Sequence, residues 1–215
     1  LTLRKKFPFR KWKVGAGEFC GSSVTQDSDF SITLNQTKFA EGMKRAKTRG
    51  RGDGTLEAND KETHEAKSVL GSGSWLAKET RPDLSAQVSF GQQTFPKPTL
   101  GQVRATSQLV KRAKQFKELS WKILAIPFKQ LRLCLHTDAS FQNAKKGGTQ
   151  GGYIVGVTDH KFALGLMAPW APATWKSYRL KRVVGSTFAG ETQTLIDGLG
   201  HAEWIACHLA EAMDQ

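Results

Sequence analysis

The stretch Arg132–Ser140 constrains the fold of this chain most, because it alternates like a β-strand and carries a carboxylate near its end. Leu133, Leu135 and Thr137 occupy every second position, and this period of two predicts a strand with two different faces. Asp138 has two interpretations here. Asp followed by Ser satisfies local backbone groups in an ordinary turn, and it also fits a functional site at the end of a strand.

Further strands are predicted directly after Asp138. A turn rich in Gly and Lys, residues 143–152, is followed by the apolar runs Tyr153–Thr158 and Phe162–Met167, which are separated by a short polar turn. Two such runs predict a hairpin, so the region is expected to form a three-stranded meander with the Asp138 strand. A longer loop, Ala168–Arg182, then leads to a helix.

Ser186 or Thr187 is a suitable cap for this helix, which is predicted to run to about Ala212 with Glu191 in its first turn. Its apolar residues are expected near one face: Phe188, Leu195, Leu199, Ala202 and Ala206.

Three strands, the first with Asp138, and a following helix with Glu191 in its first turn are similar to the ribonuclease H fold. The resemblance implies a partial, mixed sheet on which Asp138 and Glu191 are catalytic ligands of divalent metal. Mg²⁺ prefers such hard oxygen ligands. Two Mg²⁺ ions roughly 4 Å apart would activate a water and stabilise the leaving oxygen in phosphodiester hydrolysis.

Five motifs make the resemblance more specific. Gly71–Ala77, Thr80–Ser85, Thr137–Ser140, Gly151–Ile154 and Ser186–Glu191 occur in the order seen in the polyproteins of copia-type LTR retrotransposons. In that family they span the end of the reverse transcriptase and the beginning of its ribonuclease H domain. The resemblance therefore implies an RNA/DNA hybrid or another nucleic acid, and the remainder of the Pol polyprotein, as partners.

Residues 1–47 resemble the last hairpin of the copia-type polymerase palm. Residues 19–25 and 30–34 alternate as the two strands of a hairpin, and a short basic helix is expected from there to about Lys47. Phe19 and Phe30 are expected in the core, whereas the basic, aromatic segment before residue 14 is expected close to nucleic acid.

The middle of the chain is predicted to be helical. Residues 48–59 have the composition of a flexible linker, and residues 60–130 are expected to form a basic thumb or connection region. One helix should start at Asp60 or Thr63, Asp83 should cap a second over 84–93, and a third should run from 100 to 118. Residues 121–126 should then form a strand leading into the partial ribonuclease H-like domain, residues 131–215.

The net charge of +13 belongs entirely to the first two thirds of the chain. Residues 1–136 contain 25 Lys and Arg against 12 Asp and Glu, whereas residues 137–215 contain 7 of each. Such an excess binds phosphate backbones in a salt-dependent way, although a Lys-rich face kept for solubility has the same composition. The nucleic-acid-binding candidates are Arg4, Lys5, Lys6, Arg104, Lys111, Arg112, Lys114, Arg179 and Arg182.

The predicted catalytic site is expected to be incomplete. In the family the third carboxylate belongs to a strand after the helix, so it is expected beyond Gln215, and the paired polymerase aspartates are expected upstream of Leu1. Asp197 does not substitute for the missing carboxylate, because six residues turn about 240° around a helix. Opening on Leu rather than Met, the chain is expected to be a piece of a longer protein.

The remaining composition indicates an intracellular protein. Three widely spaced cysteines fit free thiols in a reducing compartment, and no apolar run or signal peptide predicts a membrane span or secretion. The overall hypothesis is an α+β retrotransposon fragment: a polymerase-palm hairpin, a helical connection and a partial ribonuclease H-like domain. The alternative is a catalytically dead nucleic-acid-binding remnant. A retroviral-integrase-like transferase is a third hypothesis, against which the polymerase-like hairpin argues.

Overall fold

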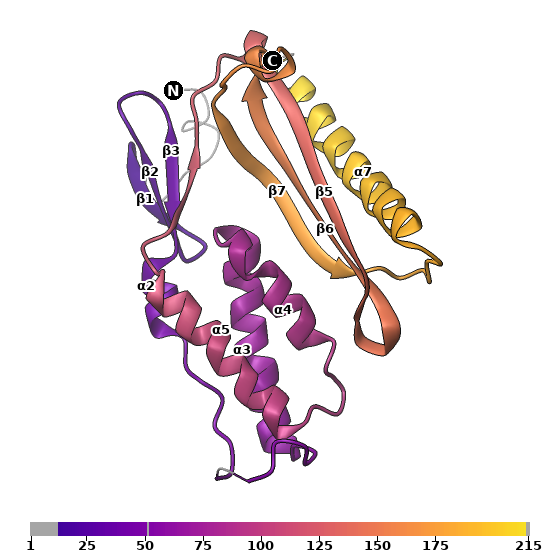
Figure 1. The fold of residues 1–215 in the computed structure, drawn as a ribbon. Helices are drawn as coiled ribbons and strands as arrows, with labels where there is room; N and C mark the ends of the chain where they lie inside the picture. Colours follow the sequence, from indigo (N-terminus) through magenta and orange to yellow (C-terminus); the bar gives the residue numbers. More distant parts are fainter. Residues whose placement is uncertain (1–12, 51, 214–215) are drawn as a thin grey trace.

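The computed structural model describes residues 13–50 and 52–213, which form an α+β fold with two antiparallel sheets and six α-helices (Figure 1). The α+β class predicted from the sequence is therefore confirmed. The predicted nucleic-acid-binding residues Arg4, Lys5 and Lys6 lie outside the described residues. None of the described helices combines the length and the apolarity that crossing a membrane requires.

The first sheet has the strand order β1-β2-β3-β4. Its strands are β1 (Ala16–Phe19), β2 (Ser22–Gln26), β3 (Ile32–Asn35) and β4 (Ser120–Ile123). The predicted hairpin is confirmed by the pairing of β2 with β3. However, its first strand is divided at Cys20 and Gly21, which both have positive φ and turn the chain from β1 into β2.

Phe19 and Phe30 were wrongly predicted to lie in the core. Their side chains are 73% and 75% exposed, because Phe19 ends an edge strand and Phe30 lies in the turn between β2 and β3 with φ of 64°. The strand predicted over residues 121–126 is present as β4, and it pairs with β3 of the first sheet.

Four helices lie below the first sheet (Figure 1). They are α2 (Thr37–Gly42), α3 (Asp60–Glu79), α4 (Ser85–Gln92) and α5 (Leu100–Gln115). Helices α3 and α4 also pack beside the second sheet. Helices α3 and α5 begin at Asp60 and Leu100, as predicted, and their capping boxes at Asn59 and Thr99 were not among the predictions. Residues such as Leu76, Leu84 and Leu109 fill the core between them. Helix α2 ends five residues before the predicted Lys47.

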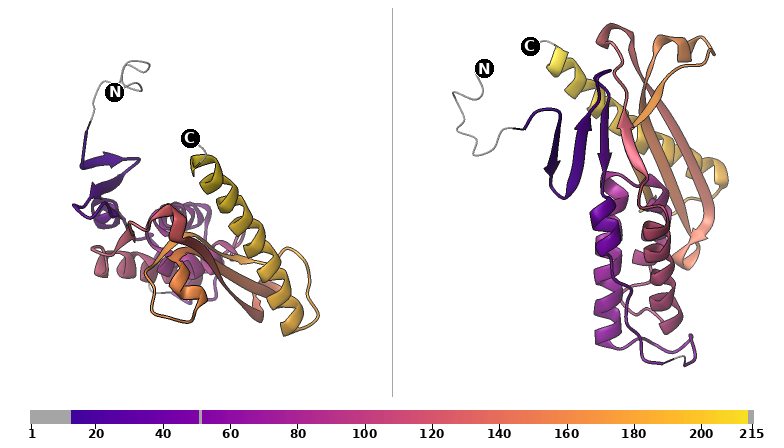
Figure 2. Two further views of the ribbon diagram at one scale, coloured as in Figure 1. Left: turned by 90° about the horizontal axis from the view of Figure 1, so that it is seen from above. Right: turned by 90° about the vertical axis from the view of Figure 1, so that its left-hand side faces the viewer.

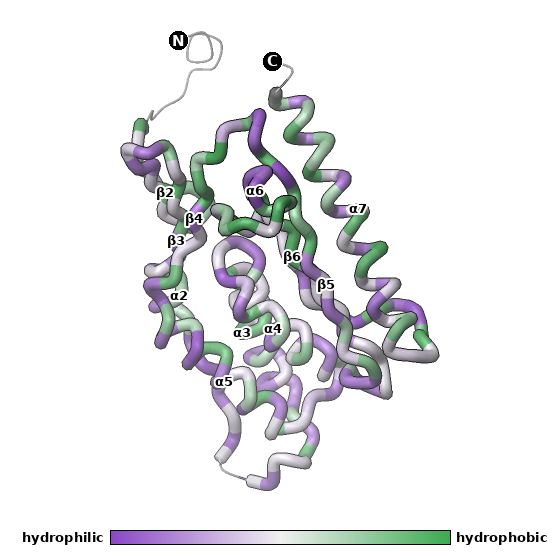
Figure 3. Tube along the Cα trace, turned by 45° about the horizontal axis from the view of Figure 1, so that its top comes forward, coloured by the Kyte–Doolittle hydropathy of each residue, from purple (hydrophilic) through white to green (hydrophobic). Residues whose placement is uncertain are grey.

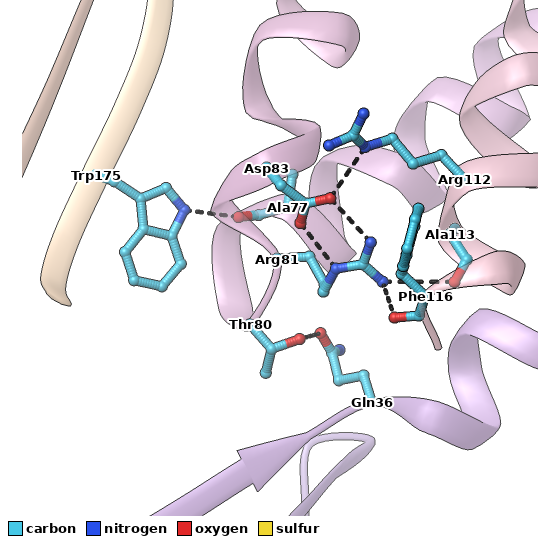
Figure 4. A network of polar contacts seen from close by, with 9 residues as sticks. All are labelled: Gln36, Ala77, Thr80, Arg81, Asp83, Arg112, Ala113, Phe116 and Trp175. Atoms are coloured by element: carbon cyan, nitrogen blue, oxygen red, sulfur yellow. Dashed lines mark hydrogen bonds and ion pairs between the residues drawn. The ribbon is translucent and has the colours of Figure 1, made fainter. Parts of the chain in front are cut away.

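Asp83 does not cap α4 as predicted. It lies in the 3₁₀ turn η1 (Pro82–Leu84), and its carboxylate accepts hydrogen bonds from Arg81 Nε and Nη2 at 2.8 and 2.9 Å (Figure 4). Arg81 is 2% exposed, and its Nη1 also donates to the carbonyl of Phe116. Although burial disfavours its charge, the hydrogen bonds and charges of Arg81 and Arg112 lower the pKa of Asp83.

The segment predicted as a flexible linker is hydrogen-bonded to the start of α5. The backbone nitrogens of Leu100 and Gly101 donate to the carbonyls of Leu56 and Gly54. The guanidinium of Arg104 donates to two further carbonyls, those of Gly50 and Gly52. These contacts hold residues 50 and 52–58 against the helix.

The second sheet has the order β5-β6-β7 and is antiparallel throughout, not mixed as predicted. Its strands are β5 (Leu131–Ala144), β6 (Gly148–Asp159) and β7 (Trp170–Arg179). The predicted meander is therefore present, but its third strand was misplaced. Residues 162–167 contain the end of the short helix α6 (His160–Ala163), and the segment predicted as a loop supplies β7.

Helix α7 (Thr187–Met213) packs against β5 and β6, and the Ser186 side chain accepts a hydrogen bond from Ala189 N, as a cap should. Small residues make this contact: Gly190, Thr194 and Gly198 are buried. The predicted apolar face is turned away, with Phe188 81% exposed. Hydrophobic residues recur along α7 (Figure 3), and several of them are exposed: Leu195, Ile196, Leu199 and Trp204.

Helices α3 and α4 lie on one face of the second sheet, and helix α7 lies on the other. Trp175 Nε1 in β7 donates to the carbonyl of Ala77 in α3 at 2.7 Å, and Gln150 Nε2 in β6 donates to Ser89 Oγ in α4 at 2.8 Å. Leu135 and Thr137 of β5 instead face Gly198 of α7. Seen from above, α7 crosses the sheet obliquely and its C-terminal end extends away from it (Figure 2).

We expect Arg81→Met to lower the free energy of unfolding by about 3 kcal/mol, because it leaves Asp83 and two helix carbonyls without their buried partner. Arg112→Gln is the matched control. Arg112 also bonds Asp83, but its side chain is 51% exposed, so its loss should cost less than about 1 kcal/mol. Urea unfolding measures both, and equal losses would contradict the role assigned to Arg81.

Candidate functional site

The two predicted metal ligands lie near one another at the open edge of β5. Glu191 lies just after the first turn of α7, not in it as predicted, and accepts a hydrogen bond from Ala139 N at 3.2 Å. Ala139 directly follows Asp138 in the strand. Strand β5 is an edge strand, with β6 on its other side. The fold therefore brings Glu191 to the backbone beside Asp138, across 52 residues of chain.

Asp138 and the body of α7 lie on different faces of the sheet. Thr137 and Ala139 face α7 at Gly198 and Gly190, and side chains alternate along a strand, so Asp138 faces the opposite way. There it lines a cavity of about 410 Å³ between α4 and the sheet. Other residues of the wall are His136, Ser140, Asn143, Phe90 and Trp175.

The described residues do not fit the two-ion site that the resemblance implies. Asp138 and Glu191 supply carboxylate oxygens, but no group of three or more His, Cys, Asp or Glu side chains in residues 13–50 and 52–213 is placed to hold a metal ion. Asp197 does not join them, because its carboxylate is hydrogen-bonded to Tyr178 and Gln193. No catalytic step through Mg²⁺ follows from this geometry.

The predicted basic residues divide into two groups. Arg104 is hydrogen-bonded to backbone carbonyls, and Arg112 forms an ion pair with Asp83, so both have structural partners. Lys111 and Lys114 are exposed on α5 and form no ion pair with any carboxylate of the described residues. They remain available to a phosphate backbone.

Arg179 and Arg182 flank the end of β7. Arg179 ends the strand, and its guanidinium lies over Gly148, where a Cβ would come within 2.4 Å of Arg179 Nε. Arg182 is exposed in the segment between β7 and α7. These two cations lie at the end of β7 and just after it, whereas Lys111 and Lys114 lie on α5.

A polar cluster between the sheet and α7 was missed by the sequence analysis. Tyr178 donates a hydrogen bond to Asp197 Oδ2 at 2.5 Å, and Gln193 Nε2 donates to Asp197 Oδ1 at 3.1 Å. Tyr153 stacks on His201 with ring centroids 4.9 Å apart. The i, i+4 spacing of Gln193, Asp197 and His201 places them on one face of a helix, which the sequence could have shown. Their tyrosine partners lie in strands β6 and β7, and the sequence does not indicate these contacts.

The environment of this cluster suppresses tyrosine ionisation. Burial, followed by the charge of Asp197, raises the pKa of Tyr153 to about 12. Burial and the hydrogen bond to Asp197 raise the pKa of Tyr178 further above its usual value. Both effects favour the neutral phenol, since the charged form is poorly solvated and lies near a carboxylate.

Comparisons of the chain with protein-family models, curated proteins and solved structures found no match.

We expect neither tyrosine of the folded protein to ionise at pH 10, near the ordinary tyrosine pKa. Because the folded-state pKa values are raised, the contribution of these groups to stability is complete below about pH 10 and is lost as the pH rises from about 10 toward 12. Tyrosinate absorbance and unfolding measured against pH test this, with urea-unfolded protein as reference.

The Asp197→Asn variant supplies the control for this titration. Removing the carboxylate should bring the pKa of Tyr178 down toward its usual value. Titration of both phenols near pH 10 in the folded wild-type protein would contradict the assigned environment.

Proposed function

We propose that this chain is part of a copia-type retrotransposon Pol polyprotein, covering the end of the reverse transcriptase and the first part of a ribonuclease H-like domain. The activity of such a polyprotein is RNA-directed DNA synthesis with metal-dependent hydrolysis of the RNA strand of RNA/DNA hybrids. The observation that carries the proposal is the bond from Ala139 N to Glu191, which brings the helix carboxylate to the strand backbone next to Asp138.

The positions of the family motifs support this proposal. Thr80–Ser85 contains Arg81 and forms the joint between the helices and the sheets. In Gly151–Ile154, a Cβ on Gly151 would approach Thr194 Oγ1 to 2.6 Å. In Ser186–Glu191, Ser186 caps α7 and Glu191 reaches β5. Three of the five motifs thus have a physical reason for their residue types.

A nucleic-acid-binding segment without chemistry is the second candidate function. The metal ligands present favour this candidate. Among the described residues, Asp138 and Glu191 are only two of the carboxylates that a two-ion Mg²⁺ site needs. Its partners would be the RNA/DNA hybrid and the rest of the polyprotein, in an intracellular setting. Both candidates require binding of the hybrid, and they differ in cleavage.

We expect the protein to bind a labelled RNA/DNA hybrid, with an affinity that falls as salt rises. Replacing Lys111 and Lys114 together by Gln should lower the slope of log K against log salt by about 2, one for each lost phosphate contact. Arg112→Gln is the control, because Arg112 is bound to Asp83 and its loss should leave the slope unchanged. An unchanged slope in the double lysine variant would remove α5 from the interface.

Cleavage of the hybrid with Mg²⁺ or Mn²⁺ decides between the two candidates. Metal-dependent cutting of the RNA strand that Glu191→Gln abolishes would support the ribonuclease H proposal. Glu203→Gln, an exposed change elsewhere on α7, is the matched control, and duplex DNA is the substrate control. Salt-sensitive binding without cleavage supports the binding segment, and absence of binding contradicts both.

A further inference from the structure

The cleft between β7 and α7 lies on the sheet face opposite the Asp138 cavity. Helix α7 packs on β5 and β6, so the helix-side face of β7 is left open. The opening has a volume of about 510 Å³, which is within the usual range for small-ligand sites. Its wall combines cations with rings and one carboxylate: Lys176, Lys181, Arg182, Tyr178, His201 and Asp197.

The charges of this cleft favour an anion. None of its three cations lies within 4.0 Å of a carboxylate in the part of the chain that the structure describes. Asp197 is the single acidic residue of the wall, and its two oxygens accept hydrogen bonds from the neutral donors Tyr178 and Gln193. Three cations against one carboxylate leave a local charge of +2, which attracts phosphate.

The rings of the cleft provide a surface on which a base could stack. His201 is exposed and stacks on Tyr153 at an interplanar angle of 27°, and Tyr153 is only 4% exposed. The buried tyrosine therefore fixes the imidazole plane from below and leaves its other face open. Every nucleobase has a flat π-face that stacks on such a ring without sequence preference.

We propose that this cleft binds one unpaired nucleotide of a single-stranded nucleic acid, with its phosphate on Lys181 and Arg182 and its base on His201. The combination of unneutralised cations and an exposed, fixed ring distinguishes this ligand from a simple anion, which needs no ring. The proposal rests on the nucleic-acid binding proposed above and adds a second contact region. It lies away from α5, which was proposed to follow a paired backbone.

Anisotropy of a short labelled single-stranded RNA tests the proposal. His201→Ala should weaken binding about tenfold through the lost stacking. His208→Ala is the matched control, because His208 is exposed on the same helix, packs on Trp204 and lies outside the cleft, so it should bind like wild type. Lys181→Gln together with Arg182→Gln should weaken binding and its salt dependence.

The proposal is wrong if the protein does not bind single-stranded RNA, or if His201→Ala and His208→Ala bind it with equal affinity. It is also wrong if polyglutamate displaces the RNA and His201→Ala does not change this displacement. The last result would assign the cleft to acidic peptide. Circular dichroism confirms that each variant is folded. Binding of the RNA/DNA hybrid by the wild-type protein separates the two proposals. If the wild-type protein binds the hybrid but His201→Ala binds single-stranded RNA as tightly as wild type, only the cleft assignment fails.

Discussion

The first sheet, the helices and the second sheet depend for their relative positions on the contacts around the buried guanidinium of Arg81. It bonds Asp83 in its own turn and the carbonyls of Ala113 and Phe116 at the end of α5 (Figure 4). The flanking residues extend the same joint. Thr80 Oγ1 donates to Gln36 at the end of the first sheet, and the Ala77 carbonyl accepts from Trp175 in the second. One short stretch thus ties both sheets to the helices, at the cost of burying a charge that is compensated only while its partners stay in place.

Local sequence signals were sufficient for much of this fold. The starts of α3 at Asp60 and of α5 at Leu100 were predicted, and each is fixed by a capping box between residues only three positions apart. The alternation around Asp138 predicted β5, and Ser186 marked the start of α7. In each case the information lies within one turn or one strand, so it does not depend on the rest of the chain.

Predictions that depended on distant partners were less successful. The apolar run 162–167 has the composition of a strand, but β7 forms from residues 170–179, where Trp175 finds a partner in α3. Asp83 has the sequence position of a cap and is instead held by Arg81 and Arg112. The Tyr178–Asp197 bond was missed for the same reason, because nothing near either residue indicates the other. At the candidate site, the resemblance predicted that Asp138 and Glu191 share a metal ion. The structure shows that the Asp138 side chain points to the face of β5 opposite α7, which the sequence did not indicate.

The position of Glu191 depends on the small residues of α7. Gly190 lies against β5 and Thr149, where a Cβ would come within 3.2 Å of Thr149 Cγ2, and a Cβ on Gly198 would come within 2.9 Å of Leu135 Cδ1. Close approach of the helix axis is therefore required for the Glu191 carboxylate to reach Ala139 N. The same approach turns the large apolar side chains of α7 outward. Phe188 and Leu199 are thus exposed because the small residues of α7 face the sheet and hold the Glu191 carboxylate at the edge of β5.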